Sequence, residues 1–290
     1  MIGKTLGKYK IVDLLGQGGM AEVYKAYQAN LDRHVAVKFI KTAIAESPDS
    51  LARFEREAKS AAALRHPNIV QIHDYDVDPE SGRPYMVMEL IEGGSLADDL
   101  EQRAASGTPL TLADTASIIG QVGAALSYAH QHGVIHRDVK PSNVMRDTTG
   151  RLILTDFGLV KLMAETGVTE SGASIGTPDY MSPEQVMGES VDARSDLYAL
   201  GVILFKLLTG QLPHRADTPM AVMLKHITDP VPDQQTIRPD LPASLARVVT
   251  QSLAKSPDER FQTADEFLAE FQAALAEADR ALVSQLLPVA

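Results

Sequence analysis

The sequence contains no cysteine and no long apolar run. Without cysteine the chain can form neither disulfides nor thiolate zinc sites, and a reducing cytoplasm is compatible with it. The most apolar stretch, Leu197–Leu208, is about twelve residues long and contains Lys206, so it predicts a buried helix rather than a membrane span. The N-terminus, Met1 to Lys4, lacks the apolar run of a signal peptide. We therefore expect no membrane segment within this chain.

Positive charge is scarce in the second part of the chain. Residues 1–90 carry 12 basic and 12 acidic side chains, whereas residues 91–290 carry 15 and 26, and the net charge is −11. Because nucleic-acid phosphates would be repelled by this excess, a nucleic-acid partner is not expected. The excess mildly favours cationic partners, or it is a solvated acidic surface that keeps the protein in solution.

The first 90 residues have the pattern of a β-rich lobe. Short runs rich in Val, Ile and Tyr predict five antiparallel strands. The predicted strands are Tyr9–Leu15, Glu22–Gln28, His34–Ile40, Ile69–Val77 and Pro84–Glu89. One helix is predicted between the third and fourth strands, from the start signal Ser47-Pro48 along an apolar stripe to Leu64.

Helices dominate the sequence beyond Gly93-Gly94. They are predicted at Ser95–Ser106, Leu112–His132, Pro183–Met187, Asp192–Thr209, Pro219–Ile227, Pro242–Leu253 and Thr263–Ala278. The predicted fold class is therefore α+β, with an N-terminal lobe at 1–90, a mostly helical C-terminal lobe at 91–275 and a C-terminal tail at 276–290. A ligand is expected in the cleft between two such lobes.

The most informative segment is His136-Arg137-Asp138-Val139-Lys140-Pro141-Ser142-Asn143. It places a carboxylate, an ammonium and an amide on one short loop, and Asp156-Phe157-Gly158 adds a second carboxylate thirteen residues after Asn143. These groups can hold a metal-bound triphosphate against a hydroxyl. A turn with helix caps would also use polar residues, but it explains neither Lys140 nor the Asp-Phe-Gly sequence.

Two further motifs precede this segment. Gly16-Gln17-Gly18-Gly19-Met20-Ala21 lies between the first two predicted strands, where glycine allows close backbone approach to phosphate, although a plain hairpin turn gives the same pattern. The next strand contains Val35-Ala36-Val37-Lys38, with lysine as one polar position in an apolar run. A lysine that faces a cleft needs a carboxylate partner, and the predicted helix offers Glu55 and Glu57.

Together these motifs resemble those of the eukaryotic-type protein kinases. The resemblance runs from about Leu6 to Ala274, and Gly-Gly-Met, Ser-Pro-Glu-Gln and Lys255-Ser256-Pro257 are typical of the bacterial PknB-type serine/threonine kinases. It implies the two-lobed protein-kinase fold, a five-stranded antiparallel sheet with one helix in the N-terminal lobe, and the cofactors ATP and Mg²⁺ or Mn²⁺.

The resemblance also assigns roles in phosphoryl transfer. Asp138 is expected to orient the attacking hydroxyl or to accept its proton, and Lys140 to neutralise charge on the transferring phosphoryl group. Asn143 and Asp156 are expected to bind the metal ion. Thr177, in a peptide-docking segment ending at Ser-Pro-Glu, is expected to bond both Asp138 and Lys140.

Other residues are expected to support these groups. By resemblance Lys38 reaches the α- and β-phosphates and is held by Glu57. A buried pair of Glu184 and Arg260 is expected to stabilise the C-terminal lobe, and Asp196 is expected to brace the backbone of the catalytic loop.

The nucleotide is expected to lie between the glycine-rich turn and the segment joining the lobes. Met88 would guard the rear of the adenine pocket, while the Glu89 carbonyl and the Ile91 N–H would pair with the ring. Read without the resemblance, the apolar members are ordinary core residues. The full expected set is Gly16, Gln17, Gly18, Val23, Ala36, Lys38, Met88, Glu89, Ile91 and Met145.

Activation is expected to involve the segment from Leu159 to Ile175. Arg137 precedes the catalytic aspartate, and in kinases with this arginine a phosphate on the activation segment pairs with it. Thr166, Thr169, Ser171 and Ser174 are available, and alignment with the PknB pattern favours Thr169 and Ser171. The transfer is expected to occur between two molecules, paired as a homodimer through their N-terminal lobes.

The substrates are expected to be proteins phosphorylated on serine or threonine, because Lys140-Pro141 follows the serine/threonine pattern. Ser95 and Ser142 stand where kinases that require upstream arginine usually carry acids, so no such requirement is expected. Two alternatives are a pseudokinase scaffold, which usually loses Lys38, Asp138 or Asp156, and a small-molecule phosphotransferase, which lacks the peptide-docking segment. We expect a cytoplasmic location, either alone or as the cytoplasmic domain of a longer membrane-anchored kinase.

Overall fold

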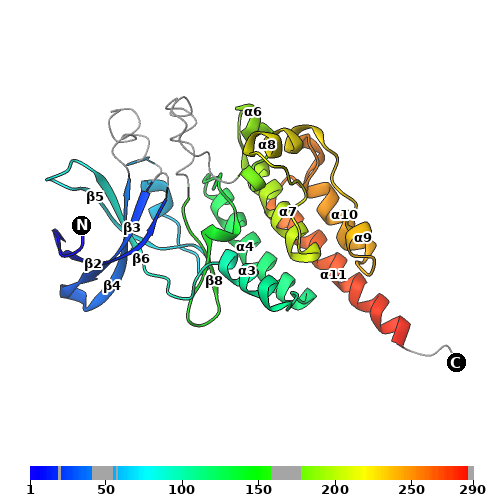
Figure 1. The fold of residues 1–290 in the computed structure, drawn as a ribbon, viewed down its shortest axis with the longest axis horizontal. Helices are drawn as coiled ribbons and strands as arrows, with labels where there is room; N and C mark the ends of the chain where they lie inside the picture. Colours follow the sequence, from blue (N-terminus) through cyan, green and yellow to red (C-terminus); the bar gives the residue numbers. More distant parts are fainter. Residues whose placement is uncertain (19–20, 41–54, 57, 158–177, 287–290) are drawn as a thin grey trace.

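A computed structural model describes residues 1–18, 21–40, 55–56, 58–157 and 178–286, with 279–286 described in their backbone alone. Among these residues a six-stranded antiparallel sheet forms one lobe and helices form the other (Figure 1). The strand order is β1-β2-β3-β4-β6-β5. The strands are β1 (Thr5–Leu6), β2 (Tyr9–Gln17), β3 (Ala21–Gln28), β4 (Arg33–Ile40), β5 (Ile72–Val77) and β6 (Pro84–Glu89). The predicted two-lobed α+β fold is thus confirmed.

The prediction of a five-stranded sheet was wrong by one edge strand. In β1, Thr5 pairs with Lys10 and Leu6 with Tyr9. Two residues are too few to show the alternation that marks a strand in sequence. The other five strands lie within two residues of their predicted ends, except that β5 begins at Ile72, three residues later than predicted.

Strand β4 separates two hydrophobic clusters. Because successive side chains point to opposite faces, Val35, Val37 and Phe39 join an outer cluster that is confined to the sheet. Ala36 and Lys38 point the other way, and Ala36 belongs to the larger cluster that continues into the helical lobe. The alternation in sequence therefore places Lys38 on the inner face of the sheet.

Helices of the second lobe follow the predicted order, with small differences at their ends. They are α3 (Leu96–Ser106), α4 (Leu112–Gln131), α6 (Pro183–Met187), α7 (Ala193–Thr209), α8 (Pro219–Thr228), α9 (Gln234–Ile237), α10 (Ala243–Ser252) and α11 (Ala264–Leu286). The short α9 was not predicted. Helix α11 extends eight residues beyond the predicted end at Ala278, so residues 276–286 of the predicted tail are helical.

The predicted helix between the third and fourth strands is described only in part. Residues 55–56 and 58–62 are helical. Its predicted start at Ser47-Pro48 lies outside the described residues. A two-stranded sheet of β7 (Val144–Arg146) and β8 (Leu152–Leu154) was not predicted, since each strand has only three residues.

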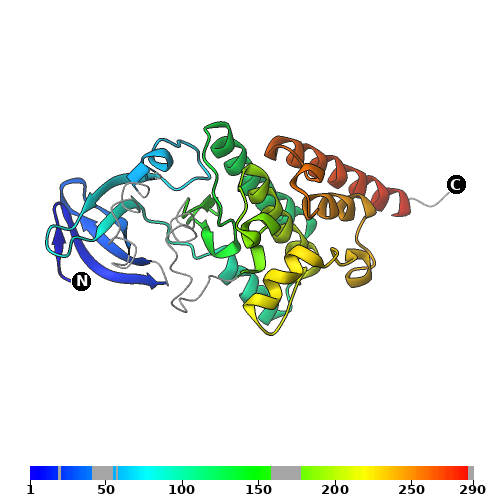
Figure 2. The same ribbon diagram turned by 90° about the horizontal axis from the view of Figure 1, so that it is seen from above.

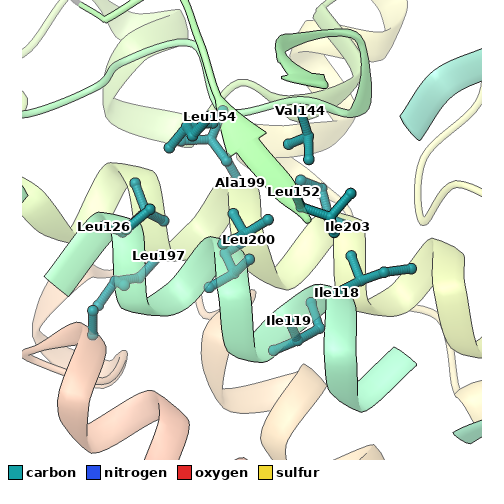
Figure 3. Packing of buried hydrophobic residues seen from close by; sticks show 14 of the residues in the cluster. Ile118, Ile119, Leu126, Val144, Leu152, Leu154, Leu197, Ala199, Leu200 and Ile203 are labelled. Atoms are coloured by element: carbon teal, nitrogen blue, oxygen red, sulfur yellow. The ribbon is translucent and has the colours of Figure 1, made fainter. Parts of the chain in front are cut away.

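Helices α4 and α7 form the centre of the helical lobe. Figure 3 shows Leu197, Leu200 and Ile203 of α7 along α4, with Leu197 near Leu126 and Ile203 near Ile118, beneath side chains of the β7–β8 hairpin. All five side chains are at most 3% exposed. This packing supports the loop that connects α4 to β7, which carries the candidate catalytic residues.

The segment that joins the lobes is held against β7. A Cβ atom added to Gly93 would lie 2.2 Å from the Arg146 carbonyl oxygen, so only glycine fits there. The Arg146 N–H donates to the Gly94 carbonyl at 2.8 Å. Along the long axis of the molecule the lobes lie end to end, with the N-terminus and helix α11 at opposite ends (Figure 2). Among the helices that the structure describes, none has the length and apolar character needed to cross a bilayer.

Candidate active site

Lys38 of the N-terminal lobe and Asp156 of the C-terminal lobe form an ion pair across the site. The Lys38 Nζ lies 2.8 Å from Asp156 Oδ1, and the lysine side chain is only 8% exposed. Burial alone would raise the pKa of Asp156, but the charge and hydrogen bond of Lys38 hold that pKa below its usual value. Asp156 is therefore an ionised carboxylate next to a buried cation.

The partner predicted for Lys38 was Glu57, which lies outside the described residues. Neighbouring Glu55 pairs with Lys59 at 2.6 Å on the exposed side of the helix. Within the described residues, the carboxylate that contacts Lys38 is Asp156. The Lys38–Glu57 pair remains a prediction.

The catalytic-loop residues predicted from the motif converge on Asp138. Lys140 Nζ lies 2.8 Å from Asp138 Oδ2. Asn143 donates from Nδ2 to the Asp138 carbonyl at 2.8 Å and to Asp138 Oδ2 at 2.9 Å. Asp138 is thus fixed by two side chains, while its side chain is still 26% exposed and accessible to a substrate. Thr177, the other predicted partner of Asp138 and Lys140, lies outside the described residues.

His136 fixes the backbone on both sides of this loop. The Asp138 N–H donates to His136 Nδ1 at 3.2 Å, and His136 Nε2 lies 2.7 Å from the Thr155 carbonyl. Since a carbonyl can only accept, this pattern assigns the proton to Nε2. The imidazole therefore connects the residue before Asp156 to the backbone of Asp138.

Asp196 holds the start of the same loop. Its carboxylate accepts from the backbone N–H groups of His136 at 2.8 Å and Arg137 at 2.7 Å, and its Oδ2 lies 2.8 Å from His130 Nε2. Burial would raise the pKa of Asp196, but the hydrogen bond with His130 holds that pKa below its usual value. The predicted bracing contact is present.

Two residues of the site have left-handed backbone. Arg137 has φ 68° and Asp156 has φ 67°. This conformation is uncommon outside glycine and marks places where the surrounding contacts overcome local strain. At Arg137 those contacts include the donation from Gln185 Nε2 to the Arg137 carbonyl at 2.8 Å. The backbone of Arg137 is therefore held by Gln185 of α6 and Asp196 of α7.

Asn143 and Asp156 are chemically suited to a divalent cation. Asn143 uses Nδ2 toward Asp138, which leaves its side-chain oxygen as the ligand, and Asp156 is an ionised carboxylate. Among the described residues no cluster of three or more His, Asp or Glu could hold a metal ion alone.

The expected nucleotide-binding residues come from both lobes. Ala36 pairs in register with Met88 and Val23 pairs with Lys38, so these four side chains lie on neighbouring strands. Ala36 and Met88 are 6% and 7% exposed. A narrow cavity of about 20 Å³, enough for roughly one water molecule, is lined by Lys38, Met88 and Asp156 among others.

The remaining residues of this set flank those four. Gly16 and Gln17 lie at the end of β2, where Gly16 pairs with Val23 and Gln17 with Glu22. The Gly18 N–H donates to the Ala21 carbonyl at 2.9 Å. Glu89 ends β6, Ile91 lies in the joining segment, and half-buried Met145 lies in β7.

Sequence reasoning missed several residues that position the site. The roles of His136 and Gln185 were not predicted, although a histidine directly after the apolar Val134-Ile135 is a signal of a buried polar contact. Asn68 was also missed; it donates to the Leu152 carbonyl at 2.7 Å and to Gln121 Oε1 at 3.0 Å. The loop after the N-terminal-lobe helix is thereby attached to β8.

The predicted pair deep in the helical lobe is confirmed. Arg260 donates from Nη1 and Nη2 to the two oxygens of Glu184, each at 2.8 Å. Both residues are at most 3% exposed. This bidentate geometry fixes the start of α6 to the segment before α11.

Comparisons with known proteins agree with this geometry. The family model described as protein kinase domain matches residues 9–271. The chain is 43% identical over 268 residues to serine/threonine-protein kinase PknB of Mycolicibacterium smegmatis, covering 91% of this chain and 42% of that protein. It is 38% identical over 281 residues to serine/threonine-protein kinase PrkC of Bacillus subtilis, covering 97% and 42%. The chain thus spans about two fifths of the length of these relatives.

A solved structure is also similar. The crystal structure of the Mycobacterium tuberculosis PknI kinase domain superposes with a TM-score of 0.76 at 30% sequence identity. The match covers 95% of this chain and 99% of the other. The similarity therefore extends over both lobes and the site between them.

Proposed function

The chain belongs to the protein kinase family, and from this premise we propose that it transfers the γ-phosphate of ATP to serine or threonine hydroxyls of proteins. The observation that carries the proposal is the convergence of Lys140 and Asn143 on Asp138, next to the Lys38–Asp156 pair. These residues are the ones that phosphoryl transfer requires.

Each side chain has a physical task in this reaction. Asp138 is positioned to accept a hydrogen bond from the substrate hydroxyl and to take its proton. Lys140 and Lys38 place positive charge where the transferring group and the nucleotide phosphates carry negative charge. Asn143 holds Asp138 in one orientation, and its side-chain oxygen would bind the metal ion together with Asp156. Bound Mg²⁺, or Mn²⁺, would neutralise charge on the triphosphate.

The proposed substrates are proteins without a required upstream arginine. Ser95 caps α3, where its hydroxyl accepts from the Asp98 N–H at 3.2 Å, and Ser142 is an exposed residue of the catalytic loop. Neither side chain brings a charge that would select arginine. A peptide array in which arginine dominates the upstream positions would contradict this proposal.

Activation by phosphorylation of the 159–175 segment is also proposed. Thr169 and Ser171 lie outside the described residues, so the support comes from Arg137, whose backbone is fixed by Asp196 and Gln185. A new charge of about −1.5 to −2 could pair with this arginine and order the segment. The test is phosphate mapping by mass spectrometry in the wild type and in Asp138→Asn. Full activity of a Thr169→Ala, Ser171→Ala double variant after phosphatase and ATP treatment would contradict the proposal.

Transfer between two copies paired through their N-terminal lobes is the proposed route. The N-terminal lobe exposes several large apolar side chains, among them Leu31 at 58% and Ile2 at 64%. Sedimentation of the wild type and of Leu31→Asp measures the pairing, and a monomeric wild type at all accessible concentrations would contradict it.

A cytoplasmic location is proposed because the cytoplasm supplies ATP, and cell fractionation tests it.

The decisive experiment is Asp138→Asn. We expect phosphotransfer from labelled ATP to fall by about 10² to 10⁴, because proton acceptance is lost while the shape of the side chain is kept. ATP binding, measured by calorimetry, should remain. The matched control is Asp258→Asn, an 88% exposed aspartate remote from the site, which should keep full activity.

The same assay separates the alternatives. A scaffold would bind partners without any labelling of protein, even in the wild type. A small-molecule phosphotransferase would label no protein and would consume ATP only with a small hydroxyl compound. Undiminished protein phosphorylation by Asp138→Asn would contradict the proposed mechanism.

A further inference from the structure

A second hollow lies in the helical lobe, away from the residues described above. It has a volume of about 700 Å³ and is bounded by the end of α3, the loop to α4, the end of α7 and α9. This volume is in the range of pockets that bind ligands. Its apolar walls are Leu100, Leu110, Leu207, Leu208 and Ile237. In Figure 1 these elements belong to the half of the molecule opposite the sheet.

The hollow is framed by more positive than negative charge. Arg103, Lys206 and Arg238 line it, with Glu101 as the acidic residue among its lining side chains. In residues 91–290 as a whole, 26 acidic side chains outnumber 15 basic ones. The local excess of cations therefore reverses the sign of the lobe in which it lies.

These cations retain capacity for an incoming carboxylate. Among the described residues Lys206 forms no ion pair; its Nζ lies 3.4 Å from the Tyr180 hydroxyl, and its charge acts on nearby Asp179. Arg103 uses Nε toward Asp99 at 3.1 Å, and Arg238 uses Nε toward Asp240 at 3.3 Å and Nη1 toward the Leu208 carbonyl at 3.1 Å. Since a guanidinium has five N–H donors, and exposed ion pairs contribute little to stability, both arginines can bind a further anion.

Lys206 also connects the hollow to the peptide-docking segment. Its Nζ lies 3.4 Å from the hydroxyl of Tyr180, in the turn Pro178–Tyr180. Helix α3, which bounds the hollow, also packs against the turn Pro141–Asn143 of the catalytic loop. A segment bound in the hollow would therefore lie on elements that also shape the active site.

We propose that this hollow docks a protein-substrate segment in which aspartate or glutamate alternates with leucine-like residues. Apolar side chains would cover the leucine and isoleucine walls, and the acidic side chains would meet the three cations. Such complementarity favours specificity and the rate of encounter. As a site for substrates the inference rests on the proposed kinase function, and it adds a chemical class to it.

Binding is measured separately from catalysis. The probe is a fluorescent peptide of alternating Asp and Leu without serine, threonine or tyrosine, titrated with the intact chain and followed by anisotropy. We expect binding that weakens with salt, and a Kd raised about five- to tenfold in Lys206→Glu and in Arg238→Glu. A peptide with Lys in place of Asp should bind Lys206→Glu more tightly than it binds the wild type. Arg247→Glu is the matched control, because it reverses the charge of a 73% exposed side chain on α10. It should change the Kd of the Asp-Leu peptide and that of the Lys-Leu peptide by no more than about twofold.

Kinetics then tests whether the docked segment is a substrate. With a threonine added to each peptide, KM for the Asp-Leu peptide should rise about five- to tenfold in both variants, and kcat should be unchanged in Arg238→Glu, which does not contact Tyr180. Thermal unfolding of each variant checks that it is folded. The two substitutions lie on different elements, so a folding defect in one variant leaves the other as a test. Equal KM values for acidic and basic peptides would overturn the inference.

The outcomes separate this inference from the kinase function. Peptide binding without phosphorylation of any peptide would refute the kinase function alone. Phosphorylation without charge-dependent binding would refute the docking site alone. The inference is wrong if the Asp-Leu peptide fails to bind. In that case, loss of self-association in Lys206→Glu and Arg238→Glu would identify a second copy as the occupant of the hollow, and loss of fatty-acid binding would identify a lipid.

Discussion

At the scale of single residues, the most consequential contact away from the reacting groups is that of Asp196 with the catalytic loop. Its two oxygens accept two backbone N–H groups, from His136 and Arg137, and Oδ2 also meets His130. In Asp196→Asn one of these acceptors becomes an NH₂ donor, which leaves a buried N–H unpaired.

We expect Asp196→Asn to lose about 1 to 3 kcal/mol of unfolding free energy, measured by urea titration. We also expect kcat to fall about tenfold or more with KM for ATP within about twofold, because the loop moves while the nucleotide contacts remain. Asp258→Asn is the exposed control. A variant with wild-type stability and kcat would show that the loop does not depend on this carboxylate.

The sequence could predict which residues form the site, but not all of their partners. Asp138, Lys140 and Asn143 were predicted because their spacing is set by one short loop, and the structure brings Lys140 and Asn143 each within 2.9 Å of Asp138. The contact between Lys38 and Asp156 joins residues that are 118 positions apart, which no local pattern encodes. For the same reason the bond from Gln185 to the catalytic loop was missed.

At the scale of secondary-structure elements, two glycines inside helices have opposite roles. Gly201 lies in α7, where an added Cβ would lie 2.5 Å from the Cβ of Ser252 on α10. Gly120 lies in α4, where an added Cβ would meet no atom within 4 Å. The first glycine permits close packing of two helices, whereas the second only weakens its own helix.

We therefore expect Gly201→Ala to destabilise the protein by about 1 to 3 kcal/mol through overpacking. Gly120→Ala should stabilise it by about 0.5 to 1 kcal/mol through helix propensity. Both are measured by urea unfolding, and each is the matched control of the other. Equal shifts of the same sign would mean that the α7–α10 contact does not limit stability.

Elements of eight or more residues could be predicted because their periodicity is visible in sequence. Strand β4 is an apolar run interrupted by Lys38 and α7 is a long apolar stretch, and both lie within one residue of their predicted ends. By contrast β1, α9 and the β7–β8 hairpin have two to four residues per element, too few for a period to emerge.

At the scale of the whole molecule, a buried group of basic side chains lies next to the turn Pro178–Tyr180. Lys255 Nζ lies 2.8 Å from the His226 carbonyl oxygen and 3.4 Å from His214 Nε2, and His226 Nδ1 lies 2.8 Å from the Tyr198 hydroxyl. Burial, and next the charge of Lys255, lowers the pKa of His214 to about 4. Burial, and next His214, lowers the pKa of His226 to about 3. Asp229 is the nearby carboxylate that opposes the shift at His214.

These two histidines should make the stability of the protein sensitive to mild acid. In the unfolded chain they take up protons as the pH falls below about 6.5, whereas the folded protein keeps them neutral down to about 4. The contribution of the two neutral histidines to the free energy of unfolding is therefore fully present above pH 6.5, and it is lost as the pH falls from 6.5 to 4. We expect the wild type to lose roughly 2 to 4 kcal/mol of unfolding free energy between pH 7 and pH 5, measured by urea titration. His214→Gln should lose about half as much over this range, because one of the two histidines is removed. An equal loss in the variant and the wild type would show that these two histidines do not set the acid limit.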